Sequence, residues 1–301
     1  MKKLLLLFGA AALLFQACQK GDSYSSSWQE NENALATGRE ISFLPLSQQT
    51  RAGMVETTSV KNFNVYAWKS DGSEYFGAHT TYTNGIYENV SQCYWPLDER
   101  LNFFAYYPRT EFDEQLIKVD DSGRYIAPWN LNGTQDLMVS SAQSTPVPAA
   151  SSPYLSLNFI HILSNFASLT LKGSQNNASY KVNSVSMTLS KYDKYYFERN
   201  AWHNSLYEPY KASFAVPDAF SGKSSSSAVQ NYSLVPGEHT LTINYTVTIN
   251  GESRTYEKTG VVDFPQGQKT TVTGVLTQDY EEVRFTTSVQ DWTEGFVDIT
   301  L

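Results

Sequence analysis

Residues 241–250, LTINYTVTIN, place the strongest constraint on what this chain can fold into. Apolar and polar side chains alternate strictly along the whole stretch, and Leu241, Ile243 and Tyr245 open the apolar series. Side chains of a β-strand point alternately to opposite faces, whereas an α-helix repeats every 3.6 residues and would scatter this series around its axis. The stretch therefore predicts a β-strand with one buried face.

Similar strand-like stretches recur along the chain, at residues 41–46, 63–68, 85–90, 93–97, 101–108, 154–159, 167–172, 182–190, 254–264, 269–276, 283–289 and 296–301. Asn-Gly pairs at 84–85 and 250–251 predict two-residue hairpin turns, because both positions of such a turn require positive φ. Short helices fit only residues 111–118 and 201–211, and the serine-rich residues 221–228 predict a mobile loop. An abundance of Tyr, Phe and Thr agrees with strands. The sequence thus indicates an all-β protein.

The N-terminus has the features of an export signal. A positively charged start precedes an apolar run, residues 4–15, that is shorter than the roughly 20 residues needed to cross a bilayer. Residues 1–17 are therefore predicted to be a signal peptide. Cys18 follows in a context that resembles a bacterial lipobox, which predicts its lipidation; the alternative is an ordinary signal peptide with an incidental cysteine. If Cys18 is lipidated, Cys93 has no disulfide partner and is expected to be a small half-buried residue in a strand.

Two polar stretches suggest how the mature chain is divided. Residues 18–38 contain little to bury and predict a flexible tether. Residues 141–153 carry three prolines, which remove ladder donors and are incompatible with an interior strand. We interpret this second stretch as a linker between an N-terminal domain, residues 39–150, and a C-terminal domain, residues 151–301. Both domains are predicted to be β-sandwiches.

Charge and motifs argue against nucleic-acid binding and catalysis. The formal net charge is −8 and there is no basic stripe of the kind that binds nucleic acid. Gly222-Lys223-Ser224 echoes the end of a phosphate-binding loop, but Pro217 stands where that motif requires glycine. The four histidines lack metal-ligand spacing, and His161 is expected to be a packed or capping residue. The sequence predicts a protein that is not an enzyme and needs no cofactor.

Aromatic residues are unusually dense between residues 192 and 207, among Lys, Asp and Asn and without clear alternation. Aromatic side chains with a polar tip favour contact surfaces, so this stretch fits a contact with carbohydrate or protein. An edge strand and its loop would have the same composition. Both interpretations remain open at the level of sequence.

Several of these stretches together resemble the fimbrillin family, the lipoprotein subunits of type V pili in anaerobic Gram-negative bacteria. The resemblance lies in ISF followed by TRAG, then FNVYAW, YWP, LNFFAYYP, DLM, LSLNFIHILSNFASLTL and the late VQDWTEG. It covers roughly residues 39–301. It implies two transthyretin-like β-sandwich domains in tandem and a structural rather than catalytic role.

The resemblance also implies a strand that is removed by proteolysis. In the family, an N-terminal strand precedes an arginine that a surface protease cleaves. By position, that strand is residues 39–46, with Ile41, Phe43 and Leu46 as its apolar residues. The cleaved bond then joins Arg51 to Ala52.

The same resemblance implies the partners of the vacated site. In the family, the C-terminal end of the next subunit supplies a replacement strand, and here Val297, Ile299 and Leu301 lie on one face of such a strand. A head-to-tail contact of this kind does not close and produces a filament. The expected partners are other pilus subunits, an arginine-specific surface protease, the outer membrane through the lipid, and a host protein or glycan. The expected location is the outer membrane and the fimbria.

Two other functions stay open from the sequence alone. The chain could be a monomeric surface lipoprotein that binds glycan or host protein through residues 192–210. A β-sandwich hydrolase would require carboxylates that meet in a cleft, and no sequence pattern predicts one.

Overall fold

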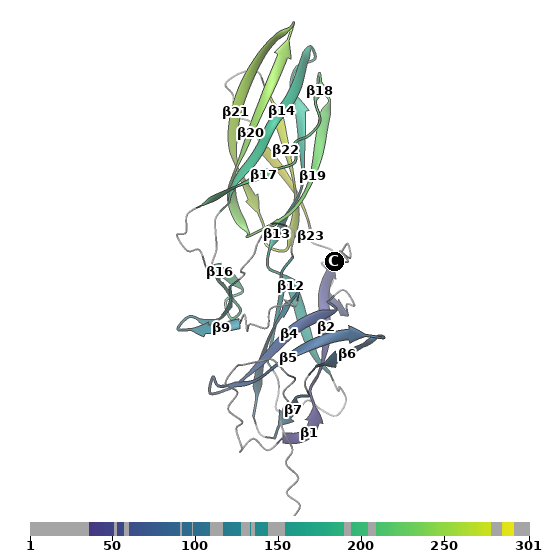
Figure 1. Ribbon diagram of the computed structural model, residues 1–301, viewed down its shortest axis with the longest axis vertical. Helices are drawn as coiled ribbons and strands as arrows, with labels where there is room; N and C mark the ends of the chain where they lie inside the picture. Colours follow the sequence, from purple (N-terminus) through teal and green to yellow (C-terminus); the bar gives the residue numbers. More distant parts are fainter. Residues whose placement is uncertain are drawn as a thin grey trace, which may run out of the picture.

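The computed structural model describes residues 36–50, 53–56, 60–90, 92–97, 99–108, 117–127, 133, 136–143, 154–189, 194–203, 209–277 and 285–291. Within these ranges all regular elements are β-strands and helices are absent, which confirms the all-β prediction. Accordingly, the described residues include no helix that could span a membrane. Figure 1 shows an elongated molecule, with the early strands in its lower part and the later strands in its upper part.

An eight-stranded sheet, here named the N-terminal sheet, forms most of the lower part. Its strands are β2 (Ser42–Thr50), β3 (Gly53–Glu56), β4 (Asn62–Lys69), β5 (Glu74–Thr83), β6 (Ile86–Asn89), β8 (Leu101–Tyr107), β11 (Met138–Gln143) and β12 (Tyr154–His161). They follow the order β3-β2-β12-β11-β8-β4-β5-β6, and only β2 and β12 are parallel neighbours. β1 (Ala36–Glu40) and β7 (Tyr94–Pro96) form a separate antiparallel pair.

The N-terminal sheet curls around one apolar core. Residues from β4, β5, β8, β11 and β12 all contribute to this core, together with Ile41 and Phe43. Asn89, at the end of β6, hydrogen-bonds to the backbone of Ile41, next to β2. The two ends of the sheet therefore approach each other, and the core is enclosed from both sides.

Two sheets packed face to face, here named the C-terminal sandwich, form the upper part. One has the order β19-β13-β22-β23 and the other β17-β14-β20-β21, with β18 also on β14. The strands are β13 (Ser164–Gly173), β14 (Ala178–Leu189), β17 (Tyr210–Phe214), β18 (Phe220–Ser221), β19 (Ser225–Leu234), β20 (Gly237–Ile249), β21 (Glu252–Phe264), β22 (Gln268–Leu276) and β23 (Phe285–Asp291). The apolar core between them contains Leu169 and Val272 from one sheet and Tyr180 and Ile243 from the other.

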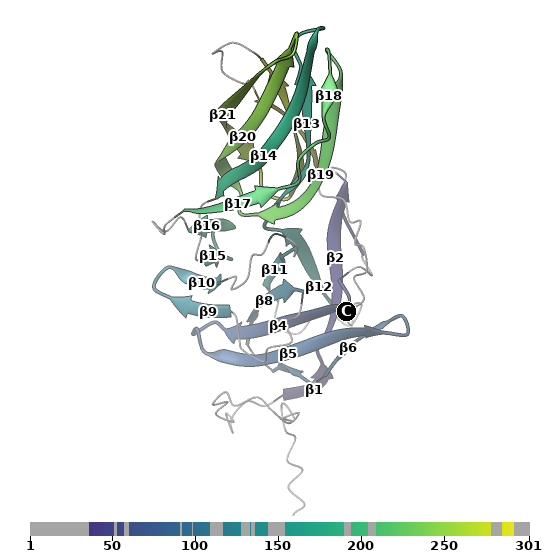
Figure 2. The ribbon, with the colours of Figure 1, turned by 45° about the horizontal axis from the view of Figure 1, so that its top comes forward.

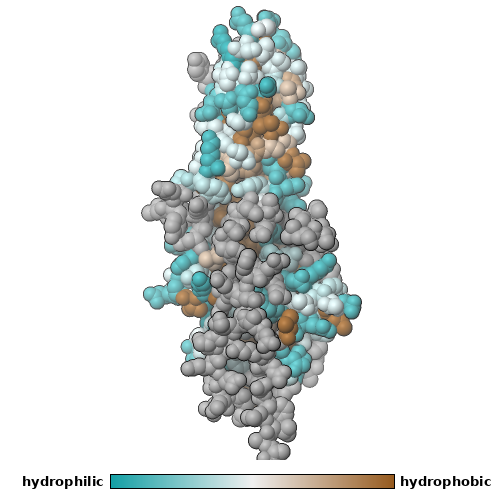
Figure 3. Space-filling view, in the orientation of Figure 1, coloured by the Kyte–Doolittle hydropathy of each residue, from teal (hydrophilic) through white to brown (hydrophobic). Residues whose placement is uncertain are grey.

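The predictions for residues 241–250 and for the two Asn-Gly turns are confirmed. Leu241, Ile243 and Tyr245 of β20 are completely buried, whereas the two residues between them are only half-buried. Much of the described surface of the upper part of the molecule is hydrophilic in the view of Figure 3. The Asn-Gly pairs at 84–85 and 250–251 join β5 to β6 and β20 to β21, and all four residues have positive φ. Positive φ at both positions is what a two-residue hairpin turn requires.

A four-stranded sheet, here named the bridging sheet, joins distant parts of the chain. β9 (Ile117–Asp120) and β10 (Gly123–Ile126) come from the first half, whereas β15 (Lys194–Tyr196) and β16 (Ala201–His203) come from between β14 and β17. The order is β16-β15-β10-β9. Its inner residues form a third apolar core with residues of β4, β8 and β11, which covers the second face of the N-terminal sheet.

The structure differs from the sequence interpretation in several places. Residues 141–143, interpreted as the start of a linker, end the interior strand β11. Residues 117–118 and 201–203, which fitted short helices, lie in β9 and β16. Residues 154–159 pair with β2 and β11 rather than with the later strands. β1 begins inside the stretch interpreted as a tether. Residues 221–228 are strand and turn instead of a loop, because β19 pairs with β13 along its length. Cys93 is completely buried and precedes β7, so it is neither half-buried nor in a strand.

Candidate functional site

The candidate site is the place where the first described part of the chain enters the N-terminal sheet. We call residues 36–50 the N-terminal segment; it comprises β1, Ile41 and β2. Ile41 and Phe43 are 0% and 1% exposed, and Leu46 is half-buried. The side chains of Ile41 and Phe43 point into the apolar core because alternate residues of an extended chain share a face.

Phe43 is the largest apolar contribution of the N-terminal segment. Its ring centroid lies 5.9 Å from that of Phe103, 6.4 Å from that of Phe63 and 6.5 Å from that of Phe76. Burying such a side chain contributes roughly 1.5–3 kcal/mol, and well-oriented ring pairs add about 0.5–1.5 kcal/mol each. The rings of Phe63, Phe76 and Phe103, with Leu157 and Phe159 of β12, line the space that holds Phe43, which we call the acceptor groove.

Backbone pairing holds the N-terminal segment on three strands. β2 runs parallel to β12 from Ser42 opposite Tyr154 to Ser47 opposite Phe159. β1 pairs with β7, and the later residues of β2 pair with β3. Figure 2 shows β2 upright beside β12 in the lower part of the molecule. Removal of the segment would uncover the edge of β12 and the groove together.

The predicted cleavage site lies outside the described residues. Arg51 and Ala52 are the two residues between the end of β2 at Thr50 and the start of β3 at Gly53, and those two end residues are Cα partners. Cys18 also lies outside the described residues, as do Val297, Ile299 and Leu301 of the expected donor strand. Their roles stay predictions.

The last described strand, β23, lies at the edge of its sheet. It pairs with β22 alone in the described part of the chain. Phe285 is half-buried, whereas residues 286–290 are exposed, and Val289 retains 46% of its accessible surface. Most of this strand therefore contributes little to the core of the C-terminal sandwich.

The aromatic stretch forms part of the bridging sheet. Tyr195, Tyr196 and Phe197 are buried, and Trp202 donates a hydrogen bond from Nε1 to the carbonyl of Ile162 at 2.7 Å. Sequence left open a contact surface or an edge strand, and β16 is indeed the edge of the bridging sheet. The Tyr195 and Phe197 rings are therefore part of the core shared with the N-terminal sheet, where Phe197 packs against Phe104.

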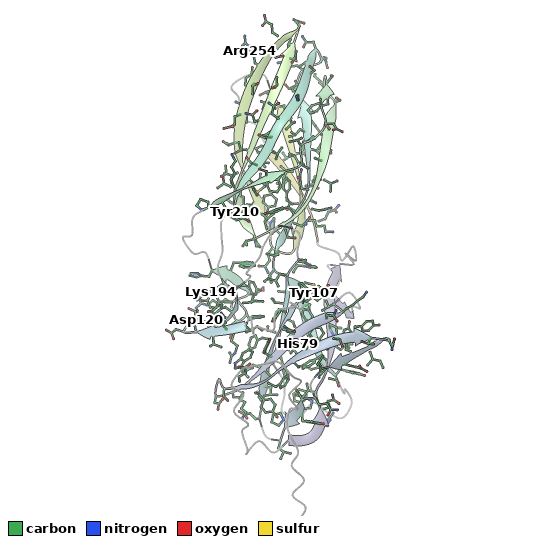
Figure 4. The ribbon with its side chains drawn as sticks, in the orientation of Figure 1. His79, Tyr107, Asp120, Lys194, Tyr210 and Arg254 are labelled. Atoms are coloured by element: carbon green, nitrogen blue, oxygen red, sulfur yellow. The ribbon has the colours of Figure 1, made fainter. Side chains whose placement is uncertain are left out.

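Charged groups on the outer face of the bridging sheet hold it together. The Lys194 ammonium lies 2.7 Å from the Asp120 carboxylate, which also accepts a hydrogen bond from the Tyr196 hydroxyl at 2.8 Å. Figure 4 shows Asp120 and Lys194 next to each other at the left of the molecule. The bond from Lys194 lowers the pKa of Asp120 to about 2. The carboxylate is therefore ionised at neutral pH and serves as a structural acceptor.

The described residues contain no cluster of three or more His, Cys, Asp or Glu side chains that could hold a metal ion. His161 is buried with Nδ1 2.7 Å from Asp136, as expected of a packed residue. Two surface pockets measure about 120 and 230 Å³, below the roughly 300–1,000 Å³ typical of small-molecule sites.

Comparison with known proteins identifies the family to which the chain belongs. A model of the fimbrillin-like family matches residues 50–292. This is well over half of the sequence, and the chain belongs to the fimbrillin-like family. Membership confirms the resemblance seen in the sequence, and it implies a structural role at the cell surface and contacts with other fimbrial subunits. No curated protein sequence matches the chain significantly.

Solved structures support the fold. A fimbrial protein from Bacteroides vulgatus is 15% identical with a TM-score of 0.55, over 85% of this chain and 100% of that chain. A candidate adhesin from Bacteroides thetaiotaomicron is 8% identical with a TM-score of 0.50, over 84% and 96%.

Proposed function

We propose that the chain is a structural subunit of a cell-surface fimbria that polymerises by β-strand exchange and contributes to adhesion. The observation that carries the proposal is the placement of Ile41 and Phe43, which fill an apolar groove from a segment near the start of the chain. After a cut that follows β2, this short segment can leave, and its neighbours β12 and β3 then each lose a pairing partner. A second strand of similar pattern can then take its place.

Release requires a cut after the segment. The Arg51–Ala52 bond lies between the last residue of β2 and the first residue of β3 in the chain, so a cut there separates the N-terminal segment from the rest of the protein. We propose that an arginine-specific surface protease cleaves this bond. An empty groove would then leave unpaired backbone groups along β12, each costing roughly 1–3 kcal/mol when buried.

The replacement is proposed to come from the C-terminal end of another subunit. Val297, Ile299 and Leu301 alternate as Ile41 and Phe43 do, so their side chains suit the same groove. Such a head-to-tail contact extends into a filament. The fold is proposed to comprise two transthyretin-like sandwiches in tandem, and Cys18 is proposed to carry the lipid that tethers the precursor to the outer membrane.

The second candidate function, a monomeric glycan- or protein-binding lipoprotein, draws less support. It relied on the aromatic rings of residues 192–210. Tyr195 and Phe197 are buried against other parts of the molecule. The Tyr196 side chain is bonded to Asp120 within the bridging sheet, so these three residues offer little surface to a ligand.

One experiment separates the two functions. The protein is exported in cells with and without an arginine-specific surface protease, and the mature N-terminus and the assembly state are determined. Strand exchange predicts a new N-terminus at Ala52 and SDS-resistant ladders that disappear when residues 296–301 are deleted. A protein that always starts at Cys18 and stays monomeric would contradict it.

A further inference from the structure

We infer that the acceptor groove binds its occupant along both backbone edges, and that Asn89 is the residue that holds the edge opposite β12. The inference rests on the proposed strand exchange and names the groups that would hold an incoming strand. The groove is bounded by hydrogen-bonding groups on both sides of its occupant, unlike a sheet edge, which offers them on one side only.

The first edge is the ladder with β12. Six consecutive residues of β2, from Ser42 to Ser47, lie opposite residues of β12 in parallel register. Parallel pairing is slightly weaker per residue than antiparallel pairing. An occupant held by this ladder alone would be an edge strand with one backbone side open.

The second edge begins at Ile41. Its N–H donates to the carbonyl of Cys93 at 2.7 Å, and its carbonyl accepts a hydrogen bond from Nδ2 of Asn89 at 2.7 Å. Both polar groups of the Ile41 backbone are thus satisfied on the side away from β12. Neither contact involves the Ile41 side chain, so any strand seated here would present the same groups.

Thr80 fixes the orientation of the Asn89 amide. The Thr80 side chain is 0% exposed, and its hydroxyl donates to Oδ1 of Asn89 at 2.9 Å. If the amide were turned over, its oxygen would face the carbonyl oxygen of Ile41 and two acceptors would meet. The buried threonine therefore keeps the amide nitrogen directed at the backbone of the occupant.

The second edge ends at β3. Residues 46, 47, 48 and 50 of β2 have Cα partners in β3. β3 follows the proposed cleavage site in the chain, so a cut at Arg51–Ala52 leaves it attached to the body of the protein. The same backbone that pairs with the departing strand then remains to pair with the arriving one.

The backbone contacts and the side-chain contacts contribute differently to recognition of the occupant. Backbone hydrogen bonds give affinity without reading sequence, while the pockets of alternate side chains give specificity. In this groove the pockets are those of Ile41 and Phe43, and the sequence-independent hold comes from β12, Asn89, the Cys93 carbonyl and β3. A strand bonded on both edges is expected to dissociate more slowly than one bonded on a single edge.

The experiment measures release of the N-terminal segment from a nicked but otherwise complete chain. A recognition site for a sequence-specific protease is inserted between Arg51 and Ala52, a dye is attached ahead of Ala36, and the folded protein is cut. Excess unlabelled peptide of residues 36–51 then displaces the labelled segment. Asn89→Asp keeps the shape and removes the donor, so release should be about three- to tenfold faster than in the parent.

A matched control and a second variant test the inference further. Asn183 also donates from Nδ2 across strands, to Oδ1 of Asn244 at 2.8 Å, but on the exposed face of the C-terminal sandwich. Asn183→Asp should leave the release rate unchanged. Val55→Pro removes one backbone donor of β3 and should also speed release.

Hydrogen exchange on the uncut chain provides an independent measurement. Asn89→Asp should increase exchange of the amides of residues 41–47 in the intact protein, whereas Asn183→Asp should not. If the nicked parent never releases its segment, strand exchange is wrong, and the exchange data alone decide the role of Asn89. If Asn89→Asp matches the parent in both measurements, the inference is overturned.

Discussion

The ring of Phe285 occupies the space beside Gly260 that a side chain there would need: a β-carbon at Gly260 would lie 2.3 Å from Cδ2 of that ring. Gly260 is in β21 and Phe285 is in β23, so this contact joins the free edges of the two sheets of the C-terminal sandwich. Gly274 of β22 borders the same ring, with a corresponding distance of 3.1 Å to Cε1. The absence of a side chain at Gly260 and Gly274 leaves the space that the Phe285 ring fills.

Gly260→Ala should therefore destabilise the protein. The added methyl group overlaps the Phe285 ring, and overpacking of this kind costs roughly 1–3 kcal/mol. Urea unfolding gives the free energy of unfolding. In a Phe285→Ala background the ring is absent and Gly260→Ala should cost much less, so a double-mutant cycle should show strong coupling; simple additivity would contradict the proposed contact.

Phe43→Ala should weaken the precursor by about 3–5 kcal/mol, because it removes a buried ring and leaves a cavity among three other rings. Leu46→Ala is the matched control within the same strand, and it should cost less because Leu46 is half-buried. Unfolding by urea, followed by the total tryptophan fluorescence, to which Trp95 of the same core contributes, measures both. Equal losses for the two variants would show that Phe43 is not the main apolar contact of the segment.

Acidification should destabilise the C-terminal sandwich through His239. This side chain is 3% exposed, and burial lowers the pKa of His239 below its ordinary value near 6.5. The folded state favours the neutral ring, so its contribution is complete above pH 6.5 and decreases as the pH falls below that value and the unfolded chain gains a proton. His239→Gln should flatten the dependence of Tm on pH between 7.5 and 5. A parent protein with the same Tm at both pH values would contradict this prediction.

Asp120 should titrate far below an ordinary aspartate. The hydrogen bond from Lys194 lowers its pKa to about 2, and bonds from Tyr196 and the Ser122 amide act in the same direction. This stabilising contribution is present above pH 4 and is lost as the pH falls toward 2. Carboxyl NMR titration measures the value directly, and Lys194→Met should move it toward the ordinary value near 3.8. An unchanged value in that variant would exclude Lys194 as the main cause.

The parts of the fold that follow from short-range pattern could be predicted from the sequence. β20 could be predicted because its alternation is complete within ten residues, and the turns at Asn84-Gly85 and Asn250-Gly251 because the dipeptide itself supplies the required φ. Both signals lie within one element. Each can be recognised without knowing which other elements the strand or turn packs against.

The parts of the fold that depend on pairing between distant segments could not be predicted from the sequence. β12 belongs to the N-terminal sheet because it pairs with β2, and β15 turns the aromatic stretch into core because it pairs with β10. Pairings between segments this far apart leave no local pattern. Serines 224–227 appeared loop-like in composition, yet most of them form a regular strand once β13 lies beside them. Asn89 and Thr80 gave no sequence signal for the groove because their importance comes from the backbone of Ile41.

The parallel pairing of β2 with β12 also has a consequence for how the protein is made. Ser42 lies opposite Tyr154, so an early part of the chain must wait for a much later part before it can dock. Contacts between such distant residues form slowly because a long loop has to close first. β2, one of the first strands to emerge during synthesis, is then among the last to pair, and until that moment its place in the sheet is open to any extended peptide nearby.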